Sequence, residues 1–276
     1  MTQSNLRHHK ILEVCVDSPE GLSIALPRAD RIELCSDLDA GGLTPSYGLM
    51  EMAMALAKRH ESPPPVLAMI RPRAGDFSYS ALELETMARD IKVARRLGLA
   101  GVVFGVTDAE RGDLAVQAML FLTEAAKGDG EGGAPALSVT LHRAIDLTPD
   151  PPACLLALIQ ALPPRSLDRV LTSGGALSAW EGRRNIARMV EAVAGTDVHI
   201  MAGAGVCLSN VSQLVATTGV REVHASCRSV GDIRGSGRGA VAEKVRAFGF
   251  SGGQGGGVVG TDAAKIETLA LLVHDL

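Results

Sequence analysis

The chain has 276 residues, of which 46% are hydrophobic and 21% charged, so most of it can fold around a large apolar core. A net charge of −4, only 3% aromatic residues and no strongly basic tract argue against a nucleic-acid partner. The chain has neither an apolar signal segment nor the run of about 20 apolar residues that crosses a membrane, so we expect a cytoplasmic protein without membrane contact. Five scattered cysteines without a CxxC pair argue against a disulfide framework.

Short apolar runs alternate with longer segments of helical periodicity along the whole chain. Eight runs predict strands, at 11–16, 31–35, 66–71, 101–105, 137–142, 169–172, 199–202 and 222–225. Helices are predicted to begin at Ser18-Pro19 and Thr44-Pro45, to run from a capping box at Ser80 to Leu97, and to occupy 111–127, 150–162, 179–194, 209–218 and 262–275. This alternation is typical of an α/β fold, and eight units predict a single-domain (β/α)8 barrel over 11–276 after a polar tail at 1–10.

Two glycine-rich segments interrupt the alternation. The first, 128–135, is predicted to be a surface loop. The second, 226–261, is long enough to be functional or disordered, and we expect an ordered first half followed by a mobile glycine tract.

The polar side chains of several predicted strands must point into the barrel. Successive strand residues face opposite sides, and the outer face must be apolar because helices cover it. The inward set therefore includes Glu13, Cys15, Glu33, Cys35, Met69, Arg71, Thr140, His142, Glu222, His224 and Ser226.

Charged groups inside a barrel are costly unless they are paired, protonated or bound to a ligand. Crowded carboxylates can yield both an ionised base and a protonated acid at neutral pH. We therefore expect a site in which Glu13 or Glu33 is the base, His142 or His224 is the acid, and Arg71 anchors an anion. Asp146 is expected beside His142. The alternative is an ion-pair network of Glu13, Glu33 and Arg71 that only fills the barrel.

Loops at the same end of the barrel add candidate ligand contacts. Arg73 follows Arg71 and could clamp the same anion, and glycines after the sixth and seventh strands could bring backbone N–H groups close to it. The candidate anion-binding residues are Arg73, Ser173, Gly174, Gly203, Gly205 and Ser226. No organic cofactor is predicted.

Cys15 and Cys35 are expected at matching places on neighbouring strands. Strands lie about 4.8 Å apart, so two thiolates there could hold one soft metal ion such as Cu(I). The alternative is that both are buried as small apolar side chains.

Eight motifs resemble, in chain order, those of the CutC family: LEVCVDS, ADRIELCSDLDAGGLTPSYG, MIRPRAGDFSYS, GLAGVVFG, VTLHRAID, DRVLTSGG, IMAGAGV and REVHAS. The resemblance covers about residues 11–276. It implies a (β/α)8 barrel, a cytoplasmic location, homodimers or homotetramers and a role in copper homeostasis, with the copper proposal on Cys15 and Cys35. This chain departs from the family pattern at Leu141, Ile145 and Cys227.

The sequence leaves three functions open. The first is a cytoplasmic copper homeostasis protein that holds Cu(I) through Cys15 and Cys35. The second is a barrel enzyme that uses the Glu/Arg/His pocket on a small anionic or phosphorylated substrate. The third is a scaffold that binds a metabolite without turnover.

Overall fold

A computed structural model describes residues 10–128, 135–231 and 258–276. The predicted tail, except Lys10, and most of the two glycine-rich segments 128–135 and 226–261, namely 129–134 and 232–257, lie outside the described residues. Among the residues that the structure describes, no helix is both long and apolar enough to cross a membrane.

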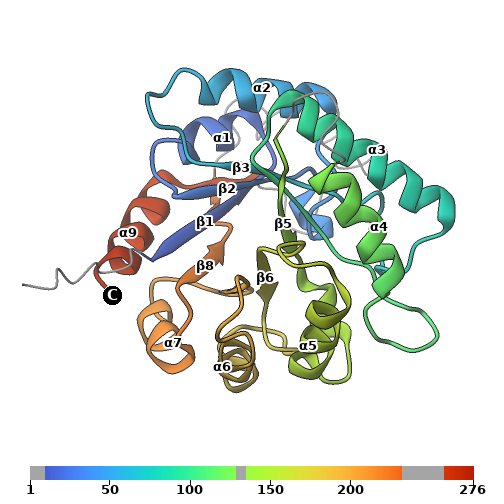
Figure 1. Ribbon diagram of the computed structural model, residues 1–276. Helices are drawn as coiled ribbons and strands as arrows, with labels where there is room; N and C mark the ends of the chain where they lie inside the picture. The colour runs from blue at the N-terminus through green and yellow to red at the C-terminus, as the bar shows by residue number, and fades with distance from the viewer. Residues whose placement is uncertain (1–9, 129–134, 232–257) are drawn as a thin grey trace, which may run out of the picture.

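Eight parallel strands close into one barrel in chain order, which confirms the predicted fold (Figure 1). The strands are β1 (Ile11–Val16), β2 (Arg31–Leu34), β3 (Val66–Met69), β4 (Gly101–Phe104), β5 (Ser138–Leu141), β6 (Arg169–Thr172), β7 (His199–Ala202) and β8 (Glu222–Ala225). The helices around them are α1 (Pro19–Ala25), α2 (Tyr47–Ala57), α3 (Ala81–Leu97), α4 (Val116–Lys127), α5 (Pro151–Ala161), α6 (Arg183–Ala192), α7 (Val211–Thr218) and α9 (Ala263–His274).

Local capping explains where the first helices begin. Ser18 accepts a hydrogen bond from the backbone N–H of Gly21 at the start of α1, and Ser80 forms the predicted capping box with Glu83 at the start of α3. The prediction for α2 was wrong. This helix begins at Tyr47 and is capped by Ser46, while Thr44 accepts a hydrogen bond from the backbone N–H of Arg71 and so ties two loops together.

The predicted orientation of the strand residues is confirmed. Leu12, Val14 and Val16 are fully buried in the apolar layer between sheet and helices, whereas Glu13 lies inside the barrel. A small separate cluster of Cys35, Leu67, Met69 and Val103 fills one side of the interior. The remaining interior holds Leu171 and Met201 together with buried charged side chains, so the barrel has the unusual polar core that the alternation predicts.

A two-stranded antiparallel sheet follows the barrel and was not predicted. It pairs β9 (Arg228–Gly231) with β10 (Val258–Thr261) next to α1 and ahead of α9. Several predicted helices also begin later than expected, since α4 starts at Val116 and α6 at Arg183. Turns with glycine in left-handed conformation, such as Gly112 with φ +69°, occupy part of the difference.

Candidate functional site

A layer of ion pairs forms the floor of the site. The Arg31 guanidinium bridges two carboxylates, with its Nε 2.5 Å from Glu13 and its Nη2 on Glu222. Arg169 contacts Glu222 at 3.2 Å from the other side. An interior ion-pair network therefore exists, but of the three members considered from the sequence it contains only Glu13. Arg31 and Arg169 take the place of Arg71, and Glu222 takes that of Glu33.

The Glu13 carboxylate is ionised and held by partners on both sides. Burial raises its pKa, but Arg31 and His224 outweigh that effect and lower it to about 2. Its Oε1 lies 2.8 Å from the Nδ1 of His224. Because Glu13 cannot accept a proton at neutral pH, it is a poor general base, and of the two candidate carboxylates only Glu33 remains suited to that role.

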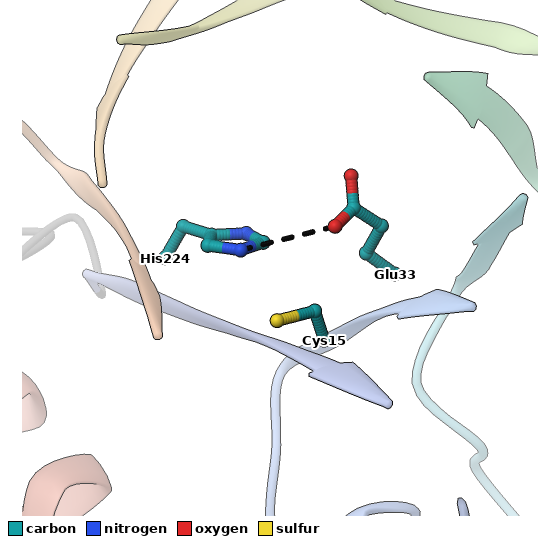
Figure 2. A group of neighbouring side chains, drawn as sticks. All are labelled: Cys15, Glu33 and His224. Carbon is teal, nitrogen blue, oxygen red and sulfur yellow. Dashed lines mark ion pairs between the residues drawn. The ribbon is translucent and has the colours of Figure 1, made fainter. Parts of the chain in front are cut away.

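Cys15, Glu33 and His224 converge just above this floor from β1, β2 and β8 (Figure 2). One ligand atom from each side chain lies within 4.8 Å of the others. The His224 Nε2 is 3.8 Å from Glu33 Oε2, while its Nδ1 faces Glu13. The two ring nitrogens therefore have different partners: Nδ1 contacts Glu13 in the floor, and Nε2 faces Glu33 in the cluster.

The register of β1 and β2 differs from the one that we expected. Cys15 pairs with Glu33 and Glu13 pairs with Arg31, so Cys35 stands one inward position farther along. Cys35 packs in the small apolar cluster, with its Sγ 3.6 Å from a Glu33 oxygen. Burial and the Glu33 carboxylate raise the pKa of its thiol well above the ordinary value. The two cysteines therefore do not occupy matching places.

Glu33 and His224 form a titratable pair above the floor, in which two arginines balance the charges of Glu13 and Glu222. Burial raises the pKa of Glu33 to about 7, against the lowering effect of His224. Burial would lower the pKa of His224, but Cys15, Glu13 and Glu33 raise it well above its ordinary value. A buried carboxyl whose pKa lies near neutral pH, beside a histidine, suits acid–base chemistry.

A cavity of about 390 Å³ opens at the carboxyl ends of the strands, directly over the cluster. Its lining brings together half of the predicted site residues, namely Cys15, Glu33, Arg71, His142, Gly205, His224 and Ser226, and adds Phe77, Arg143 and Arg228 among others. A larger cavity of about 910 Å³ lies among α3, α4 and α5, on the helical outside of the barrel and away from these groups. The smaller cavity is the candidate site because the buried charges surround it.

Arg71 and His142 stand at this mouth without an ion pair among the described residues. Arg71 is buried and donates to the carbonyl oxygens of Ala40 at 2.8 Å and Gly75 at 2.7 Å. His142 is buried, and its Nδ1 accepts the backbone N–H of Ala144 at 3.1 Å.

Asp146 is near enough for its charge to act on the His142 ring, but no hydrogen bond joins these two residues in the structure. The Asp146 carboxylate instead accepts hydrogen bonds from Thr172 Oγ1 at 2.5 Å, from the backbone N–H of Ser173 at 2.9 Å, and from that of Gly175 at 3.1 Å. Its ion pair is with Arg143. Asp146 therefore fastens the loop after β6 to the loop after β5, and this is a structural role.

Four of the six predicted anion-binding residues lie outside the cavity lining. Arg73 is occupied by Glu83 and Asp76, and Ser173 by Asp146. A Cβ at Gly174 would lie 2.3 Å from the carbonyl oxygen of Gly182, and one at Gly203 would lie 2.5 Å from Leu171, so these glycines permit close packing of the backbone. Only Gly205 and Ser226 reach the cavity.

Sequence reasoning missed Arg31 and Arg169, although the signal was present. Side chains two positions apart on a strand face the same side. Arg31 precedes the inward Glu33 by two positions and Arg169 precedes the inward Leu171 by two, so both arginines had to point into the barrel. Phe77 gave no such signal, because its position depends on how the loop after β3 folds over the mouth.

Comparison with known proteins assigns the family. The model of the CutC family matches residues 10–229. A CutC family protein of Caulobacter vibrioides is 46% identical over 220 residues, which cover 79% of this chain and 82% of that protein. A CutC family protein of Rhizobium meliloti is 43% identical over 262 residues, which cover 94% of each chain.

Solved structures agree with this assignment. The crystal structure of CutC from Streptococcus agalactiae, a protein whose name connects it with copper homeostasis, superposes with a TM-score of 0.69 and 30% identity over 79% of this chain and 98% of that one. A deoxyribose phosphate aldolase of Aeropyrum pernix gives a TM-score of 0.56 at 12% identity over 78% and 85% of the two chains, which shows a shared barrel fold alone. On the family match and the identity of its relatives, the chain belongs to the CutC family.

Proposed function

We propose that this chain serves copper homeostasis by binding Cu(I) through the Cys15 thiolate and the Nε2 of His224. The observation that carries the proposal is the convergence of Cys15, Glu33 and His224, with ligand atoms within 4.8 Å of one another. A thiolate and an imidazole suit Cu(I), which is a soft ion and accepts few ligands. The Glu33 carboxylate is a harder ligand and would lie beside the metal.

The hydrogen bond between Glu13 and His224 supports this ligand set. Metal-binding histidines usually bond their second ring nitrogen to a carboxylate or carbonyl, and this contact orients the ring. Glu13 takes that position at 2.8 Å from Nδ1, which leaves Nε2 for the metal. Cys35 is less suited than His224, because burial keeps its thiol protonated and it packs among apolar side chains.

An anaerobic titration of Cu(I) against bicinchoninate tests the proposal. We expect one tight site, with an affinity at least tenfold weaker in Cys15→Ser and in His224→Gln. Cys35→Ser and the exposed Cys207→Ser should bind as the wild type does. If Cys35→Ser loses the metal while His224→Gln keeps it, the two thiolates form the site, and if all four variants bind alike, copper is held elsewhere.

A second function is supported by groups that a Cu(I) site does not require. Arg71 and His142 share the cavity with Glu33, whose pKa is about 7. We propose an enzyme in which Glu33 transfers a proton, His142 donates a hydrogen bond and Arg71 anchors a small anionic substrate. Copper-free protein incubated in D2O with a metabolite extract should then incorporate deuterium into a small acid, and Glu33→Gln should not. Equal incorporation by both proteins would refute this role of Glu33.

The cytoplasmic location and the assembly into homodimers or homotetramers remain predictions from the resemblance. Light scattering on the purified chain measures the assembly directly.

A further inference from the structure

Two buried N–H donors at the barrel mouth lack an acceptor in the part of the chain that the structure describes. They are the Nε of Arg71 and the Nε2 of His142, and the Oε1 of Glu33 is likewise without a partner. All three side chains line the same cavity of about 390 Å³. Buried polar atoms without partners are rare, so three of them around one cavity indicate a polar ligand.

The hydrogen bond to its own loop determines which nitrogen of His142 carries the proton. The backbone N–H of Ala144 donates to Nδ1 at 3.1 Å, so Nδ1 has a free lone pair and the hydrogen of the neutral ring is on Nε2. Burial and the charge of Arg71 lower the pKa of His142 to about 3, which keeps the ring neutral. His142 is therefore a fixed, uncharged N–H donor over the whole physiological pH range.

Arg71 contributes a positive charge that no carboxylate of the described residues pairs. Its two terminal nitrogens donate to the carbonyl oxygens of Ala40, Gly42 and Gly75. The Tyr79 hydroxyl also lies near the guanidinium, but Nε itself has no hydrogen-bond partner among the described residues. Carbonyl groups orient the guanidinium but do not neutralise it. An anion in the cavity would do so.

Phe77 holds the two donors in place relative to each other. Its ring centroid is 4.5 Å from that of His142, and the Arg71 guanidinium carbon is 4.8 Å from the same ring. Both side chains are therefore ordered before any ligand arrives, which lowers the entropic cost of binding.

We propose that the cavity binds a small hydroxycarboxylate, whose carboxylate accepts hydrogen bonds from Arg71 and His142 and whose hydroxyl contacts Glu33. The proposal rests on the second function above and names its class of ligand. Arg143 and Arg228 also line the cavity but are paired with Asp146 and Asp39. The charge of Arg71 and the neutral donor of His142 match the single charge and two oxygens of a carboxylate. Phosphate is less favoured because the N–H groups of Gly174 and Gly175, in the loop after β6, are already bonded to Thr172 and Asp146.

Saturation-transfer NMR on copper-free protein tests the proposal, with glycolate, acetate and inorganic phosphate as probes. Glycolate should bind, and acetate, which lacks the hydroxyl, should bind several-fold more weakly. His142→Phe removes the donor but keeps a ring against Phe77, and it should weaken glycolate at least tenfold. The matched control is His199→Phe, since His199 is exposed at the opposite end of the barrel. Glu33→Gln should reduce the preference for glycolate over acetate.

A second measurement does not depend on any variant folding. In wild-type protein labelled with ¹⁵N-histidine, one of the seven rings should keep the neutral Nε2–H tautomer down to pH 5, where exposed rings are protonated, and its signals should move when glycolate is added. The proposal is overturned if that ring is doubly protonated, if glycolate does not bind at millimolar concentration, if phosphate binds more tightly, or if His142→Phe binds glycolate as the wild type does. Glycolate binding without deuterium incorporation into any acid would retain the ligand class and refute the enzyme.

Discussion

The Nδ1 of His224 lies 2.8 Å from the Oε1 of Glu13, and this buried contact joins the ion-pair floor of the barrel to the cluster above it. Through it, the arginines of the floor influence the imidazole that faces Cys15 and Glu33. The stability of the barrel and the chemistry of the mouth are therefore linked, and variants of either residue should change both.

Glu13→Gln should destabilise the protein strongly. It leaves Arg31 and His224 buried with one anionic partner fewer, and removal of one member of a buried ion pair typically costs about 3–5 kcal/mol. The contribution of Glu13 is complete above its unfolded pKa of 4.5 and is lost as the pH falls toward 2. Urea unfolding at neutral pH measures the difference.

The matched control is Glu267→Gln. Glu267 pairs with Arg28 but is 56% exposed, so its loss should cost less than about 1 kcal/mol. Equal losses in the two variants would show that the Glu13 pair is weak.

Glu33 should make the protein less stable as the pH rises. Its folded pKa of about 7 lies above the ordinary 4.5, so its stabilising contribution is complete below pH 4.5 and declines as the pH rises through 7. Glu33→Gln should therefore gain stability relative to the wild type between pH 5 and 8, by up to about 3 kcal/mol at 1.36 kcal/mol per pKa unit. Parallel curves of unfolding free energy against pH would contradict the raised pKa.

Cu(I) binding should release protons and weaken at acid pH. The pKa of His224 is raised well above its ordinary value, so the ring is protonated in the metal-free protein and must lose a proton to bind metal through Nε2. Titration in two buffers of different ionisation enthalpy gives the number of protons released. Binding by His224→Gln should release fewer protons than binding by the wild type, whereas the same number in both would exclude His224 as a ligand.

Asp146→Asn should affect stability and leave the cavity chemistry intact. It weakens charge-assisted hydrogen bonds from Thr172 and Ser173, each worth about 1.5–3 kcal/mol, so we expect a loss of that order. The Nε2–H tautomer of His142 should remain in the ¹⁵N spectrum, because Ala144 determines it. A change of tautomer in this variant would show that Asp146, and not only the backbone N–H of Ala144, determines which nitrogen of His142 carries the proton.

The alternation of apolar residues by itself determined the barrel and which side chains enter it. Helices cover the outside, so Leu12 and Val14 had to face out and Glu13 and Cys15 in, and this requires no knowledge of neighbouring strands. The same rule placed Glu33, His142 and His224 at one end, because the carboxyl ends of parallel strands meet there.

Only the tertiary structure decided which of these residues touch. The alternation of side chains along one strand does not define how that strand is shifted against its neighbour. In the structure, the register of β1 and β2 places Glu33, and not Cys35, opposite Cys15. Loops have no regular repeat from which side-chain directions can be predicted. The sequence therefore did not predict that Asp146 accepts hydrogen bonds from the loop after β6. It also did not predict that Phe77 packs against Arg71 and His142. Contacts between distant segments depend on how the whole cylinder closes, and local sequence does not specify them.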